Sequence, residues 1–527
     1  MSTSGPESGW APLRYQAFRR WWLAQLTSNV GSWMQTVAAQ WLMISLTSSA
    51  LLVGAIQATT LPVLLLAVPA GVLGDLFDRK RLILAGQFVM LLAAAVLGLL
   101  DLAGDVTPLL LIVLLSAIGV GQGITGPTAQ TLQPELVPPA ERPQAIALGS
   151  VNQNLARAVG PAVGGLLLAV TSAAVVFFVN ALSFVAVLGV VALVAVPARA
   201  TALPREHVLS ATRAGGRFVR SSPALIAIMI RAAAFAFFAG AVWALLPLVA
   251  RRTLGLGSGG YGLLLACVGI GAMVGATFSP AIRRALSPRA LIATCTVAIA
   301  AAALVLAVSH VAVLDGAVLA LAGLGWIIAL GTLNASYQST LPSWVKARGM
   351  AYYTIAFQGA TGIGALALGA VAQITSLDTG LVVLAAGLLA GAGATAMLPL
   401  PRPGEIDVTP AEAMPLPATP EGSVGPVLVT VTYDLAPGSE ADFLARATRL
   451  RNFRRRTGAI EWRLYRDEAV PGRYLETFLV GSWEEHERQH ARATQHDAEL
   501  LEDLDRLLVP GTQRTAQHYL AATRQRV

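Results

Sequence analysis

The sequence predicts an all-α polytopic membrane protein that ends in a small α+β domain. Hydrophobic residues make up 55% of its 527 residues and charged residues only 13%, and the mean hydropathy is +0.64. Soluble domains contain about 25% charged residues, so this composition is typical of a chain that lies mostly in lipid. The long apolar stretches are confined to the first 400 residues, and charged residues are frequent after them. The two parts therefore have different surroundings.

Twelve stretches in the first part are each long enough to cross a bilayer, which requires about 20 mainly apolar residues. They lie near 21–46, 51–74, 82–101, 106–126, 144–169, 173–196, 224–250, 259–281, 289–309, 311–333, 349–373 and 376–398. We predict twelve transmembrane helices in two six-helix halves, at 1–200 and 224–400. The cytoplasmic loop between them, 201–223, mixes apolar side chains with arginines. This pattern fits either an amphipathic helix on the membrane surface or a disordered basic linker.

The basic residues predict the orientation of these helices, because lysine and arginine gather in cytoplasmic loops. An N-terminus in the cytoplasm places 17 of the 21 basic residues of this part in inner loops or the N-terminal tail. Arg251 and Arg252 fall in an outer loop, and Arg157 and Arg231 fall within helices. We expect a multi-pass protein of the plasma or inner membrane with both termini cytoplasmic. Anchoring beside lipid explains the positive charge, so no nucleic-acid partner is expected.

Two segments carry a family resemblance. One reads F-R-R-W-W-L-A-Q-L-T-S-N-V-G-S-W-M-Q-T-V-A-A-Q-W-L and covers residues 18–42; the other reads G-V-L-G-D-L-F-D-R-K-R and covers residues 71–81. Together they resemble the major facilitator superfamily, in the branch of the enterobactin exporter and the transmembrane secretion effectors. The resemblance covers the whole membrane part and implies a secondary transporter with two helical halves.

The second segment corresponds to a loop pattern of that family, G-x-x-x-D-(R/K)-x-G-(R/K)-(R/K). The pattern places gating residues at Gly71, Asp75, Arg79, Lys80 and Arg81. The resemblance implies that the Asp75 carboxylate caps the start of the eleventh helix, near residue 349, while the cytoplasmic side is closed. A carboxylate at a helix N-terminus is stabilised by about 0.3–2 kcal/mol. The alternative is that these residues are only topological anchors.

Two positions depart from the pattern of this loop. Leu76 replaces a basic residue and Asp78 replaces a glycine. The gate is therefore expected to be balanced differently from that of the family.

The fifth predicted helix contains A-V-G-P-A-V-G-G, with Gly160, Pro161, Gly164 and Gly165. This segment resembles the glycine-proline signature of drug:proton antiporters, which favours an exporter over an importer. Ala156 stands where that signature usually has an upstream glycine. The alternative is close packing of small residues, which is common between membrane helices.

Polar side chains within the predicted spans mark a candidate substrate cavity, because lipid would not accept them. Those of the first helix follow spacings of three and four and so share one face. The candidate cavity residues are Asn29, Thr36, Gln40, Asn154, Arg157 and Gln358. An arginine deep within a span costs about 2.5 kcal/mol or more unless it is partnered or hydrated. Arg157 is therefore either a substrate or coupling contact, or a structural hydrogen-bonding group.

Few residues of the predicted spans could couple transport to a source of energy. No acidic residue lies plainly in mid-membrane, and Asp315, at the start of the tenth helix, is the nearest candidate for a titrating group. Coupling to H⁺ is implied only by the family resemblance. No Walker A sequence is present, so direct use of ATP is not expected.

Beyond residue 400 the chain changes character. Prolines punctuate 401–425, which predicts an extended linker. Residues 426–527 follow the order strand, helix, strand, strand, helix, strand, with a single helix at 483–508, which suggests a soluble cytoplasmic ferredoxin-like sandwich. The domain resembles the antibiotic-biosynthesis-monooxygenase type, and this resemblance implies self-association through the sheets.

A zinc-protease pattern, H-E-x-x-H-x-x-G-x-x-H, is nearly matched within this domain. It places a weak candidate metal site at His486, His490 and His496, with Glu487 as a base. Ala493 replaces the glycine that lets the third histidine turn back, and it lies in a stretch that favours continued helix. No metal or cofactor is therefore expected.

Two functions remain at this point. The first is a secondary exporter that moves a small, partly hydrophobic molecule, such as a drug, siderophore or secreted metabolite, by alternating access, and is not an enzyme. The alternative is a membrane-tethered enzyme whose C-terminal domain performs oxygenation or zinc-dependent hydrolysis. The expected partners of the exporter are its substrate, the lipid bilayer and H⁺.

Overall fold

The computed structural model describes residues 9–59, 61, 79–193, 208–411 and 425–521. The chain divides into two compact units, each built from three stretches. The membrane unit comprises Met1–Pro204, Ile230–Thr332 and Thr354–Met397. The tail unit comprises Arg205–Met229, Leu333–Tyr353 and Leu398–Val527.

Long helices make up most of the described chain before residue 400, as predicted. They are α1 (Gln16–Leu46), α2 (Ala50–Ala58), α4 (Arg79–Ala103), α5 (Pro108–Leu132), α6 (Arg142–Val170), α7 (Ala173–Leu193), α8 (Val208–Arg220), α9 (Pro223–Leu248), α10 (Ser258–Ala285), α11 (Pro288–Val308), α12 (Ala312–Ser339), α13 (Lys346–Ile374) and α14 (Leu377–Thr395).

Nine helices of the described residues are long and apolar enough to cross a membrane. α1 and α6, which contain 31 and 29 residues, are long enough but more polar, and they carry most of the candidate cavity residues. Most of the predicted second span, 51–74, lies outside the described residues. The multi-span helical fold therefore stands, and the number twelve stays a prediction.

Local sequence sets several of these helix boundaries. Thr107 and Ser287 each precede a proline at the first helical position, and their side chains accept hydrogen bonds from Leu110 N and Ala290 N, both at 3.3 Å. A hydroxyl at the N-cap and a proline just after it satisfy or remove the unpaired N–H groups of a helix start. Short polar connections therefore end one helix and begin the next.

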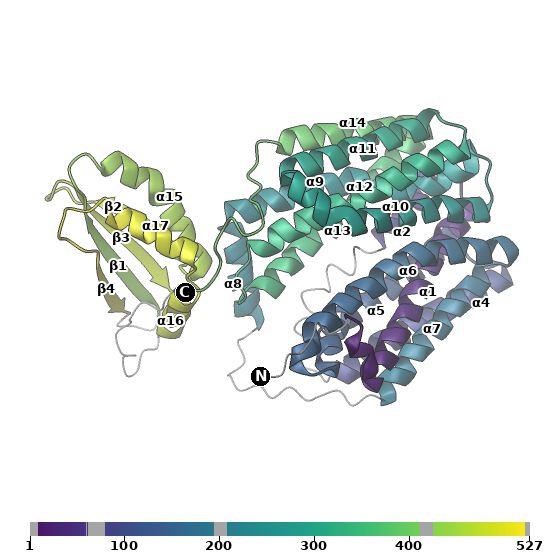
Figure 1. The fold of residues 1–527 in the computed structure, drawn as a ribbon, viewed down its shortest axis with the longest axis horizontal. Helices are drawn as coiled ribbons and strands as arrows, with labels where there is room; N and C mark the ends of the chain where they lie inside the picture. The colour runs from purple at the N-terminus through teal and green to yellow at the C-terminus, as the bar shows by residue number, and fades with distance from the viewer. Residues whose placement is uncertain (1–8, 60, 62–78, 194–207, 412–424, 522–527) are drawn as a thin grey trace. The chain divides into compact units, whose positions relative to one another are not determined.

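Within the membrane unit, α1, α4, α5, α6 and α7 form one group, and α9 to α14 form another (Figure 1). Helices α6 and α10 lie side by side and join the two groups. Small residues permit this contact: an added Cβ at Gly165 would lie 2.4 Å from Gly262 Cα. The predicted glycine-proline segment of α6 therefore includes a point where the backbones of the two groups touch.

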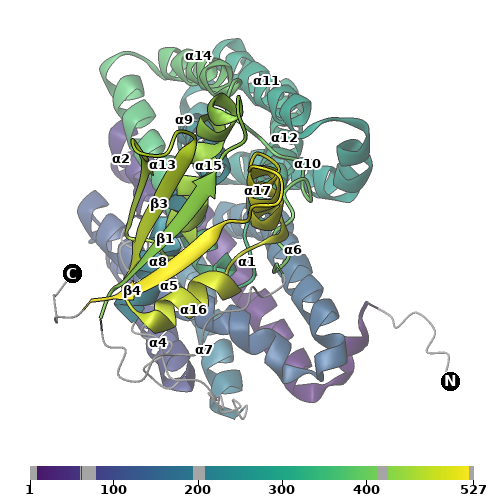
Figure 2. The ribbon, with the colours of Figure 1, turned by 90° about the vertical axis from the view of Figure 1, so that its left-hand side faces the viewer.

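The tail unit contains a four-stranded antiparallel sheet with the order β2-β3-β1-β4. Its elements are β1 (Val427–Asp434), α15 (Glu440–Thr457), β2 (Glu461–Arg466), β3 (Arg473–Val480), α16 (Trp483–Ala491), α17 (Gln495–Asp505) and β4 (Thr515–Leu520). The helices lie on one face of the sheet (Figures 1 and 2). Alternate residues of β1 and β3 are buried beneath them, as period-two patterning requires.

The single helix predicted at 483–508 was wrong, because the structure breaks it at residues 492–494. Thr494 caps the second helix, and the Asp497 carboxylate accepts from Thr494 N at 3.0 Å and from its hydroxyl at 2.8 Å. This capping box satisfies the N–H groups of a helix start. Ala493 therefore ends a turn and does not lie in a continuous helix.

Candidate functional site

The predicted gating loop is only partly described, because Gly71 and Asp75 lie outside the described residues. Arg79 begins α4, and Lys80 Nζ donates to the Ala192 carbonyl, 2.8 Å away, near the end of α7. Arg81 is exposed on α4. The latch between Asp75 and the start of α13 therefore stays a prediction.

The polar face of α1 forms hydrogen bonds to other helices. Asn29 Nδ2 donates to Asn152 Oδ1 at 2.8 Å, and Asn152 Nδ2 donates to the Trp22 carbonyl at 2.8 Å, so α1 and α6 share a polar seam. Gln40 Oε1 accepts from the Tyr261 hydroxyl of α10. The Thr36 hydroxyl donates to Ser32 O, at 3.0 Å, within its own helix. Asn29 and Gln40 are thus structural in this conformation, whichever ligand the unit binds.

Arg157 differs from those residues. Its side chain is half-buried on α6, its Nε is enclosed without a hydrogen-bond partner, and the guanidinium carbon lies 5.6 Å from the centre of the Trp33 ring. Asn154, one turn earlier on α6, is exposed, and Gln358 is half-buried on α13. The sequence identified Arg157, but Trp33 carried no signal that distinguished it from a packing residue.

The glycines of α6 occupy close contacts in two directions. Gly160 and Gly164 both face α1. A Cβ added at Gly160 would lie 2.5 Å from Trp33 Cβ, and one added at Gly164 would lie 2.7 Å from Met34 Cα. Gly165 faces α10, and Pro161 lies buried within the helix. Close packing therefore accounts for the spacing of these glycines in the structure, and the antiporter role of the segment stays a prediction.

A set of contacts, here called the distal contact, joins the two helix groups at the ends of α1 and α6 that lie farther along the chain. It consists of Arg251 with Ile44 O, Arg252 with Ser48 O, Tyr261 with Gln40, Gln373 with Ala50 N, and Gly165 with Gly262. Both arginines lie in a π-helical turn, Val249–Thr253, that continues α9. The sequence predicts them only as outer-loop residues.

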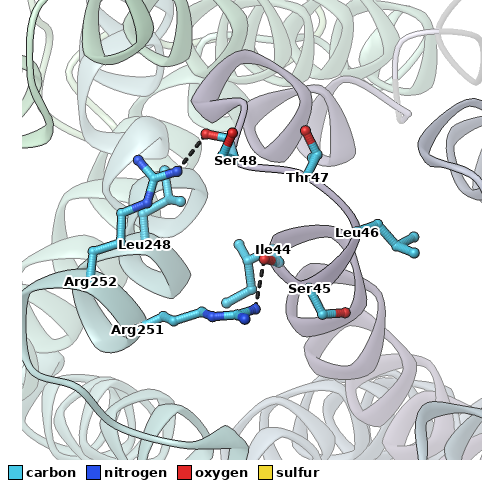
Figure 3. Close-up of a pocket in the computed structure, with 8 residues that line it drawn as sticks. All are labelled: Ile44, Ser45, Leu46, Thr47, Ser48, Leu248, Arg251 and Arg252. Atoms are coloured by element: carbon cyan, nitrogen blue, oxygen red, sulfur yellow. Dashed lines mark hydrogen bonds between the residues drawn. The ribbon is translucent and has the colours of Figure 1, made fainter.

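The two arginines border a hollow of about 330 Å³ at the end of α1 (Figure 3). Arg251 donates to Ile44 O at 2.7 Å, and Arg252 donates to Ser48 O. The last carbonyls of a helix have no partner within it and carry partial negative charge, so arginine is a favourable cap. The sequence does give one signal for this pair: Arg251 and Arg252 are the basic residues predicted to lie in the outer loops.

Asp315 lies in the first turn of α12 and is fully buried. Its polar neighbours are Ser309 and His310, which lie just before the helix. An ionised carboxylate is costly to bury without a partner, and protonation removes that cost. The sequence placed Asp315 at a helix end but did not indicate that it is enclosed.

The histidines of the tail unit do not form the predicted set. The His486 ring lies 4.8 Å from that of His490 and 4.9 Å from that of His518, measured between centres, whereas His496 lies on α17 beside Glu499. Burial lowers the pKa of both His486 and His490 to about 4. Among the residues the structure describes, no group of three or more His, Cys, Asp or Glu could hold a metal ion.

The fold of the tail unit also brings α8 against the C-terminal domain. Arg217 of α8 lies 3.6 Å from Glu485 of α16, and Glu485 bonds Arg492 at 2.6 Å. The Arg492 guanidinium lies 4.6 Å from the centre of the Trp344 ring, which Phe218 of α8 meets edge-on at 5.5 Å. The helix between the predicted halves therefore packs on the C-terminal domain.

Three relatives illustrate what the chain is similar to. It is 29% identical to the staphyloferrin A transporter of Staphylococcus aureus over 30% of this chain and 41% of that protein. It is 30% identical to the enterobactin exporter EntS of Citrobacter koseri over 60% of this chain and 76% of that protein. It is 30% identical to the multidrug efflux pump Tap of Mycobacterium tuberculosis over 31% of this chain and 40% of that protein. Two of these alignments thus span about two-fifths of the relative.

Solved transporter structures share the fold. A bacterial homolog of the human lysosomal transporter Spinster, inward-facing and unoccupied, matches 74% of this chain and 94% of its own with a TM-score of 0.54 and 14% identity. The nucleoside transporter NupG matches 73% of this chain and 99% of its own, with a TM-score of 0.57 and 14% identity. The family model described as transmembrane secretion effector matches residues 7–526. This chain therefore belongs to the transmembrane secretion effectors, a family of major facilitator membrane proteins.

Proposed function

We propose that this protein exports a small, partly hydrophobic molecule from the cell by alternating access. The observation that carries the proposal is the match of the family model over residues 7–526, together with two helix groups that are joined at the distal contact. Two of the relatives are named as an exporter and an efflux pump. All three relatives are named for transport, so a tethered enzyme has less support.

In this proposal twelve helices cross the inner membrane with both termini in the cytoplasm, and the distal contact faces outward. Its hydrogen bonds would then close the outer side of the transporter. Contacts between the groups continue inward along α6 and α10 as far as Ala158 and Gly269, where an added Cβ at Gly269 would lie 3.0 Å from Ala158 Cα. The Asp75 latch would close the opposite side, so the two sets of contacts would alternate.

Proton coupling is proposed through Asp315. Asp315 is enclosed away from water in this state, so its protonation can change when the surrounding helices move and water reaches it. Proton release would thereby be linked to the conformational change. Replacing Asp315 with Asn keeps the shape of the side chain but removes the titration, so we expect transport that no longer responds to a pH gradient.

The C-terminal domain is proposed as a ferredoxin-like regulatory attachment that associates with a second copy through its sheet. The strand order β2-β3-β1-β4 supports the fold assignment. The sheet face opposite the helices carries partly exposed apolar side chains at Leu428, Tyr465 and Tyr519. An apolar sheet face of this kind is a surface that a partner can cover.

The test of export is transport into inverted membrane vesicles with an imposed pH gradient. Two probes of fixed and opposite charge, naphthalene-2-sulfonate and (2-naphthyl)trimethylammonium, do not cross lipid unaided at a useful rate. The export proposal requires that the protein carry at least one of them faster than vesicles without it. Asp75→Asn should slow turnover at unchanged expression, and a chain without residues 401–527 should still transport. If neither probe moves, export of molecules of this class is wrong.

A further inference from the structure

Arg157, whose side chain is half-buried with its Nε enclosed, differs from the buried cations that the structure describes. Arg231 donates to the Thr395 carbonyl, and Arg454 forms two hydrogen bonds, at 2.9 and 3.1 Å, to Glu476. Among the described residues, by contrast, the Arg157 guanidinium forms neither a hydrogen bond nor an ion pair. The guanidinium carbon lies 5.6 Å from the centre of the Trp33 ring. The Arg157 guanidinium therefore lies beside an aromatic ring, but no described acidic side chain neutralises its charge.

The position of Arg157 along its helix excludes the membrane surface as the source of a partner. Arg157 is the sixteenth of the 29 residues of α6, so it lies about 22 Å along the axis from Arg142 and about 20 Å from Val170. An arginine side chain reaches only several ångströms along its helix. Lipid phosphates at either end of the helix are therefore too distant to pair with Arg157.

None of the acidic side chains that the structure describes in the membrane unit forms an ion pair with Arg157. Glu141 pairs with Arg14 at the start of α6, and Asp101 accepts from Ala174 N at 2.7 Å. Asp315 lies at the start of another helix, α12. A buried unpaired charge costs several kcal/mol, and a protein retains one where a ligand supplies the opposite charge.

We propose that the Arg157 guanidinium binds the negative group of the transported molecule, which makes the substrate an organic anion with a flat apolar part. The inference rests on the proposed export function and specifies its substrate class. A guanidinium offers parallel N–H donors whose spacing matches the oxygens of a carboxylate or sulfonate. Hydrogen bonds between these oppositely charged groups are stronger than those between neutral groups. Its faces stack on aromatic rings, and the half-buried Trp33 ring beside it provides an apolar surface. Asn154, on the same face of α6, adds a neutral donor.

The test compares binding of the same two naphthalene probes to the purified full chain in lipid nanodiscs by equilibrium dialysis. The native protein should prefer the sulfonate to the ammonium. Arg157→Gln should weaken sulfonate binding at least about tenfold, the loss expected for one charge-assisted hydrogen bond. Binding of the ammonium should stay the same or improve. Arg157→Lys, which keeps the charge but loses the planar fork, should have an intermediate preference.

The ratio of the two affinities makes the result independent of how much of a variant folds. Arg142→Gln, at the exposed start of the same helix, removes an equal charge and should leave the ratio unchanged. If Arg157 only ties helices together, Arg157→Gln will lower both affinities, or the thermal stability, without changing the ratio. An unchanged ratio in Arg157→Gln, or a preference of the native protein for the ammonium, would overturn the anion proposal. Transport of the ammonium would still support the proposed export function.

Discussion

Glu476 shows what a buried charge requires in this protein. Its side chain is fully buried in the tail unit, and its carboxylate accepts from Arg454 Nε at 2.9 Å, Tyr433 Oη at 2.8 Å and Trp462 Nε1 at 2.8 Å. These donors replace the water that the carboxylate loses on folding. Arg157 has no comparable set of partners among the described residues, so we treat Arg454, which pairs with Glu476, as structural and assign Arg157 to a ligand.

Removal of Glu476 should destabilise the C-terminal domain strongly. Glu476→Ala leaves the Arg454 guanidinium buried without its partner, a change that costs about 3–5 kcal/mol. Chemical denaturation of the full chain in detergent, followed by hydrogen exchange of α15 and β3, measures the loss. Glu461→Ala, at a side chain that is 61% exposed, should change stability by less than about 0.5 kcal/mol. Equal losses in the two variants would contradict this account.

Acid should loosen the same domain through His486 and His490. Burial holds their pKa values at about 4, below the ordinary 6.5, and the neighbouring Arg454 and His518 act in the same direction. The unfolded chain therefore binds more protons than the folded domain below about pH 6.5. Stability should be highest above about pH 7, fall as the pH drops and level off below about pH 4.

Calorimetry of the full chain at several pH values tests this slope. His490→Phe removes one of the two titrations and should flatten the slope between pH 7 and pH 4. His496→Phe, at a partly exposed histidine on α17, should leave it unchanged. An unaltered slope for His490→Phe would show that other groups control acid stability.

At the scale of single elements, α6 and α10 approach each other more closely than side chains allow. Gly165→Ala would place a Cβ 2.4 Å from Gly262 Cα, so the backbones must separate. We expect the distal contact to open and transport of the naphthalene probes to fall severalfold, while the helix content is kept. Gly189→Ala on α7, where no atom lies within 4 Å of the added Cβ, is the matched control. Normal transport by Gly165→Ala would mean that this contact is not part of the gate.

The break between α16 and α17 illustrates the limit of prediction at this scale. Residues 483–508 favour helix by composition, and the sequence indicated one continuous helix. Thr494 and Asp497 nonetheless form a capping box, and Asp407 and Thr409 provide carbonyls to His496 N and Gln495 N at 3.1 and 2.9 Å. The chain before the domain thus supplies hydrogen bonds that a local pattern does not contain.

At the scale of the whole molecule, α8 connects the stretch between the predicted halves to the C-terminal domain. Gly215 and Gly216 let α8 approach α13 closely, since added Cβ atoms would lie 2.9 Å from Arg348 Cβ and from Tyr352 Oη. α8 also contacts α15 and, through Arg217, Glu485 of α16. A movement of α8 would therefore be transmitted to the domain.

Charge reversal tests this connection. Glu485→Arg places like charges beside Arg217 and Arg492, so protection of α8 from hydrogen exchange should fall by about tenfold or more at low salt. The double change with Arg217→Glu should restore part of it. Glu484→Arg, at an exposed neighbouring position, is the control and should have no such effect. Unchanged protection in Glu485→Arg would show that α8 does not depend on this domain.

The sequence by itself determined the membrane character, the long apolar helices and the order of the strands in the tail, and it singled out Arg157 as a cation within a helix. These follow from composition and from periodic patterns, which depend only on nearby residues. Tertiary structure alone decided which polar groups are satisfied. Among the described residues, Asn29 and Gln40 have hydrogen-bond partners and Arg157 has none, and His518 lies beside His486 where His496 was predicted. Hydrogen bonds and burial join residues that are far apart in the chain, so no local pattern contains them.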